Sequence, residues 1–256
     1  MKILPLSPAL EPKFWEYVNQ DIPHNYFFAL DWKYNRNDTK ILLALKENRI
    51  DGMMLIFKER IVQLRGSRES GEALLEQLTL KNAELLVSEQ HEKSTIEKYQ
   101  PTRVHELILM MLHKGEENLH IAHPLVPLDS SDAEGIATIM TRLKPEVWGE
   151  FTRERIIEGM NTMKWVGIKE DGELVSIGRA RLTERVGHIP TVATHEAHRN
   201  KGYATSITSY LVKLILEKAP IAIIFTLSDN PSAIKVYNKV GFKPYRKYLT
   251  IKGIKR

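Results

Sequence analysis

The feature that most constrains this chain is that its two halves repeat one order of secondary-structure elements. Residues 40–56 and 164–180 each read as two strands joined by a tight turn. In each half a strand, a helix, a second strand, a shorter helix and a closing strand follow. In the second half we predict these at 188–194, 202–218, 222–227, 231–240 and 245–251. In the first half we predict them at 61–66, 71–80, 83–87, 92–99 and 104–110. One order at a nearly constant offset indicates a duplication.

This order of elements predicts an α/β fold with a mixed sheet in each half. The hairpin strands are antiparallel, and the strands joined through the long helix are parallel by a right-handed crossover. The segment His120–Asp129 contains two prolines and reads as a linker. We therefore predict an N-terminal domain at 1–122 and a C-terminal domain at 126–256. Residues 1–35 and 129–162 are expected to be the leading helical parts.

The segment after the strand at 188–194 has the composition of an anion-binding loop. It reads Arg199-Asn200-Lys201-Gly202-Tyr203-Ala204 and leads into a helix with apolar residues on one face. The first turn of a helix presents free N–H groups and the positive end of the macrodipole. Gly202 lets the backbone turn and approach a phosphate closely. The position therefore favours a diphosphate that is held mainly by the backbone.

A second motif follows the strand at 222–227. Asn230 suits a helix N-cap, Pro231 suits the first helical position and Gly241 suits the helix end. The pattern Asn-x-x-Ala-x-x-x-Tyr-x-x-x-Gly-Phe starts at Asn230 and includes Tyr237. Together with the loop, it resembles the acetyl-CoA motifs of the GNAT superfamily of N-acetyltransferases. The resemblance covers about residues 126–256.

The resemblance implies two tandem GNAT-like mixed α/β domains, of which the C-terminal one binds CoA. In that superfamily the two strands splay apart around the pantetheine. By this resemblance the pantetheine is bound by the backbone of Val192, Ala193 and Thr194, and Asn230 makes a further contact with it. The resemblance also implies that the diphosphate is bound by Arg199, Asn200, Lys201, Gly202, Tyr203, Ala204 and Thr205. Tyr237 is the implied general acid and His188 the implied base, with Glu134 and Glu150 as further candidates for the base.

Residues 68–73 also match the pattern Arg-x-x-Gly-x-Ala. However, Glu69 and Glu72 would put negative charge where a diphosphate must sit, and the loop before the helix is shorter. The downstream segment also lacks an Asn-Pro cap. We therefore predict that the first half is a degenerate copy that binds no CoA and helps to shape the acceptor cleft.

Composition narrows the remaining function classes. The 256 residues carry a net charge of +5, but Lys and Arg are spread along the chain, so nucleic-acid binding is not expected. Cysteine is absent, which excludes a thiolate nucleophile and agrees with direct transfer. His195 and His198 lack further ligands at metal-binding spacing, so no metal is expected. No apolar run reaches membrane-spanning length and no signal peptide is evident, so we expect a cytoplasmic protein without a membrane partner.

From these features we predict an N-acetyltransferase that moves an acetyl group from acetyl-CoA directly to a primary amine. The acceptor amine is a small molecule or a protein, and the sequence does not choose between them. Two alternatives stay open: a CoA-binding regulatory or scaffold module without turnover, and transfer of a longer acyl group. Acetyl-CoA and the amine are the predicted partners, and a homodimer is left open.

Overall fold

The computed structural model of the chain describes residues 1–141 and 151–256. It contains two compact units, each of which is built from more than one stretch of the chain. Unit 1 consists of Met1–Ile108, Leu227–Asp229 and Arg246–Arg256, and unit 2 consists of Leu109–Thr226 and Asn230–Tyr245. Because the units interleave along the chain, the domain boundaries predicted from the sequence stay a prediction.

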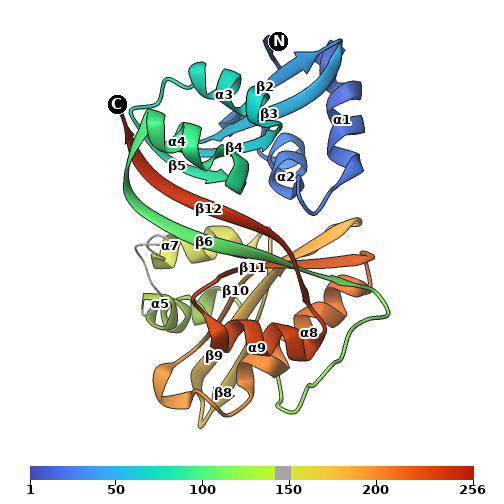
Figure 1. Ribbon diagram of the computed structural model, residues 1–256. Helices are drawn as coiled ribbons and strands as arrows, with labels where there is room; N and C mark the ends of the chain where they lie inside the picture. The colour runs from blue at the N-terminus through green and yellow to red at the C-terminus, as the bar shows by residue number, and fades with distance from the viewer. Residues whose placement is uncertain (142–150) are drawn as a thin grey trace. The chain divides into compact units, whose positions relative to one another are not determined.

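Unit 1 is a mixed sheet with helices on both faces. Its strands lie in the order β1-β2-β3-β4-β5-β12-β6 (Figure 1). They are β1 (Lys2–Pro5), β2 (Thr39–Lys46), β3 (Arg49–Phe57), β4 (Ile61–Gly66), β5 (Asn82–Val87) and parts of β6 (Tyr99–His113) and β12 (Lys243–Lys255). The helices are α1 (Glu11–Gln20), α2 (Tyr26–Tyr34), α3 (Arg68–Glu76) and α4 (Glu92–Lys98).

The alternation of β2 explains the two layers of unit 1. Leu43 joins a buried cluster with Phe14 of α1 and Phe28 of α2. Its neighbour Ala44 joins a different cluster with Leu74 of α3. Successive side chains of a strand point to opposite faces, so one strand serves both hydrophobic layers.

The last strand of the chain completes the sheet of unit 1. In β12, Leu249–Ile254 pair antiparallel with Asn82–Val87 of β5. On its other side Gly253 lies against Tyr99 and Gln100 at the start of β6. The local pattern indicates a closing strand here, and the pairing partner is set by contacts distant in sequence.

Unit 2 repeats the plan with the strand order β11-β10-β9-β8-β7. Its strands are β7 (Val126–Pro127), β8 (Lys164–Glu170), β9 (Glu173–Arg181), β10 (Val186–Thr194) and β11 (Ile221–Leu227). Its described helices are α5 (Ala133–Thr141), α7 (Arg153–Met160), α8 (Tyr203–Leu216) and α9 (Pro231–Val240). The hairpin β8–β9 is antiparallel, whereas β10 and β11 are parallel, so the predicted mixed α/β class is confirmed.

Helices cover both faces of the sheet in unit 2. A Cβ on Gly178 of β9 would meet Ile207 of α8 at 2.3 Å, so this glycine allows α8 to pack closely. The neighbouring Ile177 instead packs with Ile136 of α5 and Ile156 of α7. Alternate positions of β9 therefore face either α8 or the α5–α7 pair. None of the described helices is long and apolar enough to cross a bilayer.

Candidate active site

The strands β10 and β11 of unit 2 separate halfway along their length. Parallel pairing joins Val186–Ile189 to Ile221–Ile224 and ends there within the described chain. On its other edge β10 continues to pair with β9 as far as Thr194, with an irregularity between His188 and Thr191. The later half of β10 therefore presents one backbone edge that β11 does not pair. This edge carries the three residues predicted to bind pantetheine, Val192, Ala193 and Thr194.

The loop after β10 leads into α8 without a side-chain cap. Gly202 is the N-cap and has φ 87° and ψ 2°, a left-handed conformation that glycine adopts without the Cβ penalty. Asn200 is also left-handed, with φ 65°. No acidic residue lies in the first turn of α8. The N–H groups of this turn are thus left for a ligand or water, as an anion site requires.

Glu170 at the end of β8 joins the loop to the sheet, a contact that no sequence motif predicted. Its carboxylate lies 2.6 Å from Nδ1 of His198 and 3.0 Å from Nζ of Lys201, and it accepts a hydrogen bond from the hydroxyl of Tyr203. The hydrogen bond from Lys201 is the largest of the causes that hold the pKa of Glu170 below its usual value. Arg199 is exposed to solvent and leaves its charge available to a ligand.

The predicted linker also contributes to the loop. His123 Nδ1 lies 2.8 Å from the Ser206 hydroxyl of α8, and its ring meets the Tyr203 ring edge-on at 4.7 Å between centroids. A Cβ on Gly202 would lie 3.4 Å from His123. The linker histidine therefore supports the start of α8. Sequence reasoning missed it because the linker pattern carries no sign of where it packs.

Tyr237 lies on α9, and Asn230 is the N-cap residue of this helix. The Asn230 side chain accepts a hydrogen bond from the Ala233 N–H at 3.2 Å, so it caps the helix as expected for its position. Tyr237 is 6% exposed and packs edge-on against Phe242. Burial raises the pKa of Tyr237. The hydroxyl therefore keeps its proton across the physiological range, which a general acid requires.

His188, the predicted base, lies on β10 in the paired part of the strand. It is 8% exposed, and its ring meets Phe225 edge-on. Burial, together with the charges of Arg179 and Arg181, lowers the pKa of His188 to about 3. The imidazole is thus neutral at pH 7 and only weakly basic. Of the other candidates, Glu134 lies on α5, and Glu150 lies outside the described residues.

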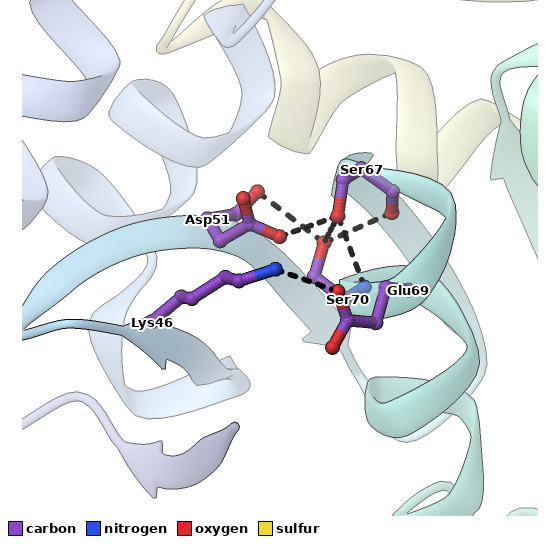
Figure 2. A network of polar contacts seen from close by, with 5 residues as sticks. All are labelled: Lys46, Asp51, Ser67, Glu69 and Ser70. Carbon is purple, nitrogen blue, oxygen red and sulfur yellow. Dashed lines mark hydrogen bonds and ion pairs between the residues drawn. The ribbon is translucent and has the colours of Figure 1, made fainter.

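The corresponding helix start in unit 1 is occupied by the protein's own side chains. Ser67 caps α3 and accepts a hydrogen bond from the Ser70 N–H. The Ser67 hydroxyl donates to the carboxylate of Asp51, and Glu69 of the first turn pairs with Lys46 (Figure 2). A capped helix start beside two carboxylates repels an anion. This geometry supports the prediction that the first half binds no CoA.

Arg65 fills the place where β4 and β5 of unit 1 separate. Their pairing ends at Gln63 and Leu86, and the Arg65 guanidinium donates to the carbonyl oxygens of His24 at 3.1 Å and Leu64 at 2.9 Å. Arg65 is 1% exposed and lies 4.8 Å from the Tyr248 ring centroid. The strands therefore diverge in both units, but a buried side chain occupies the first divergence.

Comparison with known proteins agrees with this geometry. Residues 165–251 match the family model described as FR47-like protein, and no curated protein matches the chain. A Drosophila protein of known structure is 11% identical, with a TM-score of 0.75 over 98% of each chain. A GCN5-related N-acetyltransferase from Sphaerobacter thermophilus is 13% identical, with a TM-score of 0.68 over 99% of this chain and 96% of that chain. A tandem GNAT protein from the clavulanic acid biosynthesis pathway is 10% identical, with a TM-score of 0.58 over 99% and 98%.

The chain has a tandem GNAT fold. The similarity to GNAT structures, one of them a tandem GNAT protein, spans nearly the whole chain, which confirms the fold implied by the two motifs. The family model covers the β8–β9 hairpin, the loop at residues 199–205 and α9, which include most of the candidate site. Within the described residues of this GNAT-fold protein, no group of three or more His, Asp or Glu side chains could hold a metal ion.

Proposed function

We propose that unit 2 is an N-acetyltransferase that transfers an acetyl group from acetyl-CoA to a primary amine. The observation that carries the proposal is the unpaired edge of β10 leading into an uncapped helix start. The edge offers amide and carbonyl groups to the pantetheine arm, and the helix start offers N–H groups to the diphosphate. The GNAT fold supports acyl-CoA-dependent transfer as the general chemistry.

The fit of CoA rests on the sign of the charges at the loop. Arg199 is exposed, and Lys201 pairs with the carboxylate of Glu170, which also contacts His198. Gly202 places no side chain between the ligand and the helix N–H groups. We infer that residues 199–205 hold the diphosphate and that Asn230 both caps α9 and contacts the pantetheine.

Bound acetyl-CoA would supply the acetyl group as an activated thioester. We assign the stabilisation of the developing oxyanion to a backbone N–H near Val192. The amine nitrogen forms a bond to the acetyl carbon, and the carbon–sulfur bond breaks. Tyr237, which burial keeps protonated, donates its proton to the leaving sulfur, and the proton that the nitrogen loses returns to Tyr237 through solvent water. Because the pKa of His188 is about 3, we assign it no proton uptake from an ammonium group, and the amine enters in its neutral form.

The experiment is a release assay for free CoA with acetyl-CoA and a panel of primary amines. The chain contains no cysteine, so a thiol reagent reports only the released CoA. We expect saturable, amine-dependent release that Tyr237→Phe lowers strongly without weakening binding of CoA. Binding without turnover across the panel would favour the regulatory or scaffold module, for which the weak basicity of His188 is the supporting observation. Faster release from a longer acyl-CoA would revise the donor.

A further inference from the structure

Two arginines lie on one face of β9 beside the separated strands. Arg179 and Arg181 are two residues apart and therefore point to the same face, the one covered by α5 and α7. The Arg179 guanidinium lies 5.0 Å from the Trp165 ring centroid and 5.7 Å from that of Phe151. Two aromatic rings thus hold the flat guanidinium group in place.

The polar partners of both arginines are uncharged hydroxyl groups. Arg179 Nε donates to the Thr191 hydroxyl at 3.0 Å, and Arg181 Nη2 donates to the Thr162 hydroxyl at 3.3 Å. Among residues 1–141 and 151–256, no carboxylate forms an ion pair with either guanidinium. Each guanidinium carries five N–H donors, and most of them have no acceptor among the residues that the structure describes, so they remain for a ligand.

The electrostatic surroundings show the same deficit of negative charge. Burial, together with the charges of Arg181 and Arg155, lowers the pKa of Arg179 to about 10. A half-buried cation beside other cations is costly unless an anion compensates it. Lys169 of the same unit, by contrast, has Asp132 at 2.9 Å. An anion that enters from outside would complete the arginine pair.

The arginine pair lies next to the candidate acyl site. Thr191, which accepts the hydrogen bond from Arg179, directly precedes the unpaired β10 edge at 192–194. The positive charges of Arg179 and Arg181 both lower the pKa of the nearby His188. A molecule bound to the arginines therefore lies along the strand that would hold the thioester.

We propose that Arg179 and Arg181 bind a carboxylate of the acceptor, so that the acceptor is an amine that also carries a carboxylate group. This inference rests on the proposed amine acetylation. A planar guanidinium fixed by two rings matches the planar, two-oxygen geometry of a carboxylate. The amine of the same molecule then reaches toward the β10 edge, and the arginines select the acceptor by its charge.

The test compares matched acceptors in the CoA-release assay. Amino acids are measured against their carboxamides and against phosphoethanolamine, with wild-type protein and with Arg181→Gln. We expect KM for the amino acid to lie about 10-fold or more below KM for its amide, as for a charge-assisted hydrogen bond. Arg181→Gln should raise KM for the amino acid about 10–100-fold and change that for the amide little. Lys169→Gln, which removes a charge paired elsewhere, should leave both values near wild type.

A binding measurement keeps this inference separate from the proposed function. Isothermal titration of CoA-saturated protein with an amino acid should show binding that Arg181→Gln weakens, and bound CoA checks that the variant is folded. Carboxylate binding without turnover of any amine would support the carboxylate site and reject the acetyltransferase. Equal use of acids and amides, unchanged in Arg181→Gln, would overturn the carboxylate site. A preference for phosphoethanolamine over every amino acid would overturn it as well.

Discussion

Replacing Gly202 with alanine tests whether the helix start of α8 is built for a ligand. At φ 87° an L-residue is strained, and the left-handed region costs a residue with a Cβ about 1–2 kcal/mol. The added Cβ would also lie 3.4 Å from His123, which packs against Tyr203 at the same helix start. We expect the backbone of the loop to shift in order to relieve this strain.

The stability effect has a matched control elsewhere in unit 2. Gly115 has φ 93°, and an added Cβ there meets no atom within 4 Å. Gly115→Ala should therefore carry the same backbone strain without a neighbouring ligand site. For either variant, about 1–2 kcal/mol corresponds to a fall in Tm of roughly 2–8 °C in a protein of this size.

Binding of CoA should separate the two variants. The shifted loop turns its N–H groups away from the diphosphate, and the loss of about 1.4 kcal/mol of contact energy raises Kd about 10-fold. We expect this rise for Gly202→Ala and an unchanged Kd for Gly115→Ala, measured by isothermal titration with CoA. Equal affinity of the two variants, at equal losses in Tm, would refute the anion-loop reasoning.

Substitutions at three other residues probe the rest of the candidate site. Tyr237→Phe should lower kcat about 10²–10³-fold in the CoA-release assay, while Kd for CoA stays within about twofold, because only the proton donor is lost. Asn230→Ala removes the cap on Ala233 and should cost about 1 kcal/mol in denaturant unfolding. Asn230→Ser keeps a capping oxygen, so a rise in Kd for CoA without that loss of stability would show a cofactor contact. The pKa of His188 is lowered to about 3 in the folded protein, whereas the histidine of the unfolded chain takes up a proton near pH 6.5. The free energy of unfolding of wild type should therefore fall by about 1.5 kcal/mol between pH 6.5 and 5. His188→Gln removes this titration and should make the free energy of unfolding less dependent on pH in that range. Parallel unfolding curves of wild type and His188→Gln across that range would contradict the assignment.

Local patterns were sufficient for most elements of the fold. The hairpin predicted at 164–180 is found as Lys164–Glu170 and Glu173–Arg181, joined by a turn with left-handed Asp171 and Gly172. The helix predicted at 202–218 is found as Tyr203–Leu216. Alternation, apolar spacing, caps and turn residues are encoded within short windows, so they can be read from one sequence. The sequence analysis missed the short strands β1 and β7, because strands of so few residues are too short to show the alternation of apolar and polar side chains.

Contacts between distant parts of the chain could not be read in the same way. The pairing of β12 with β5 joins residues from opposite ends of the chain. Glu170 reaches the loop from the preceding hairpin, and His123 reaches it from the linker. Arg179 reads in the sequence as one more charge, and its aromatic partners become visible only in the folded unit. Such contacts depend on which side chains the fold brings together, which no local pattern encodes.

The two copies differ at the two places where the second copy has its candidate ligand site. Both contain parallel strands that separate after a few pairs. In unit 1 the divergence holds the buried Arg65, and the helix start carries the Ser67 cap beside Asp51. In unit 2 the same two places present a backbone edge and an uncapped glycine turn. The difference lies in a few side chains that satisfy the backbone groups from within the chain. Removing such a side chain would leave a buried polar group unsatisfied, since the hydrogen bond from Arg65 to the Leu64 carbonyl oxygen is buried. The first copy therefore depends for its stability on the side chains that occupy the point where its strands separate, whereas in the function proposed for the second copy a cofactor satisfies the same groups.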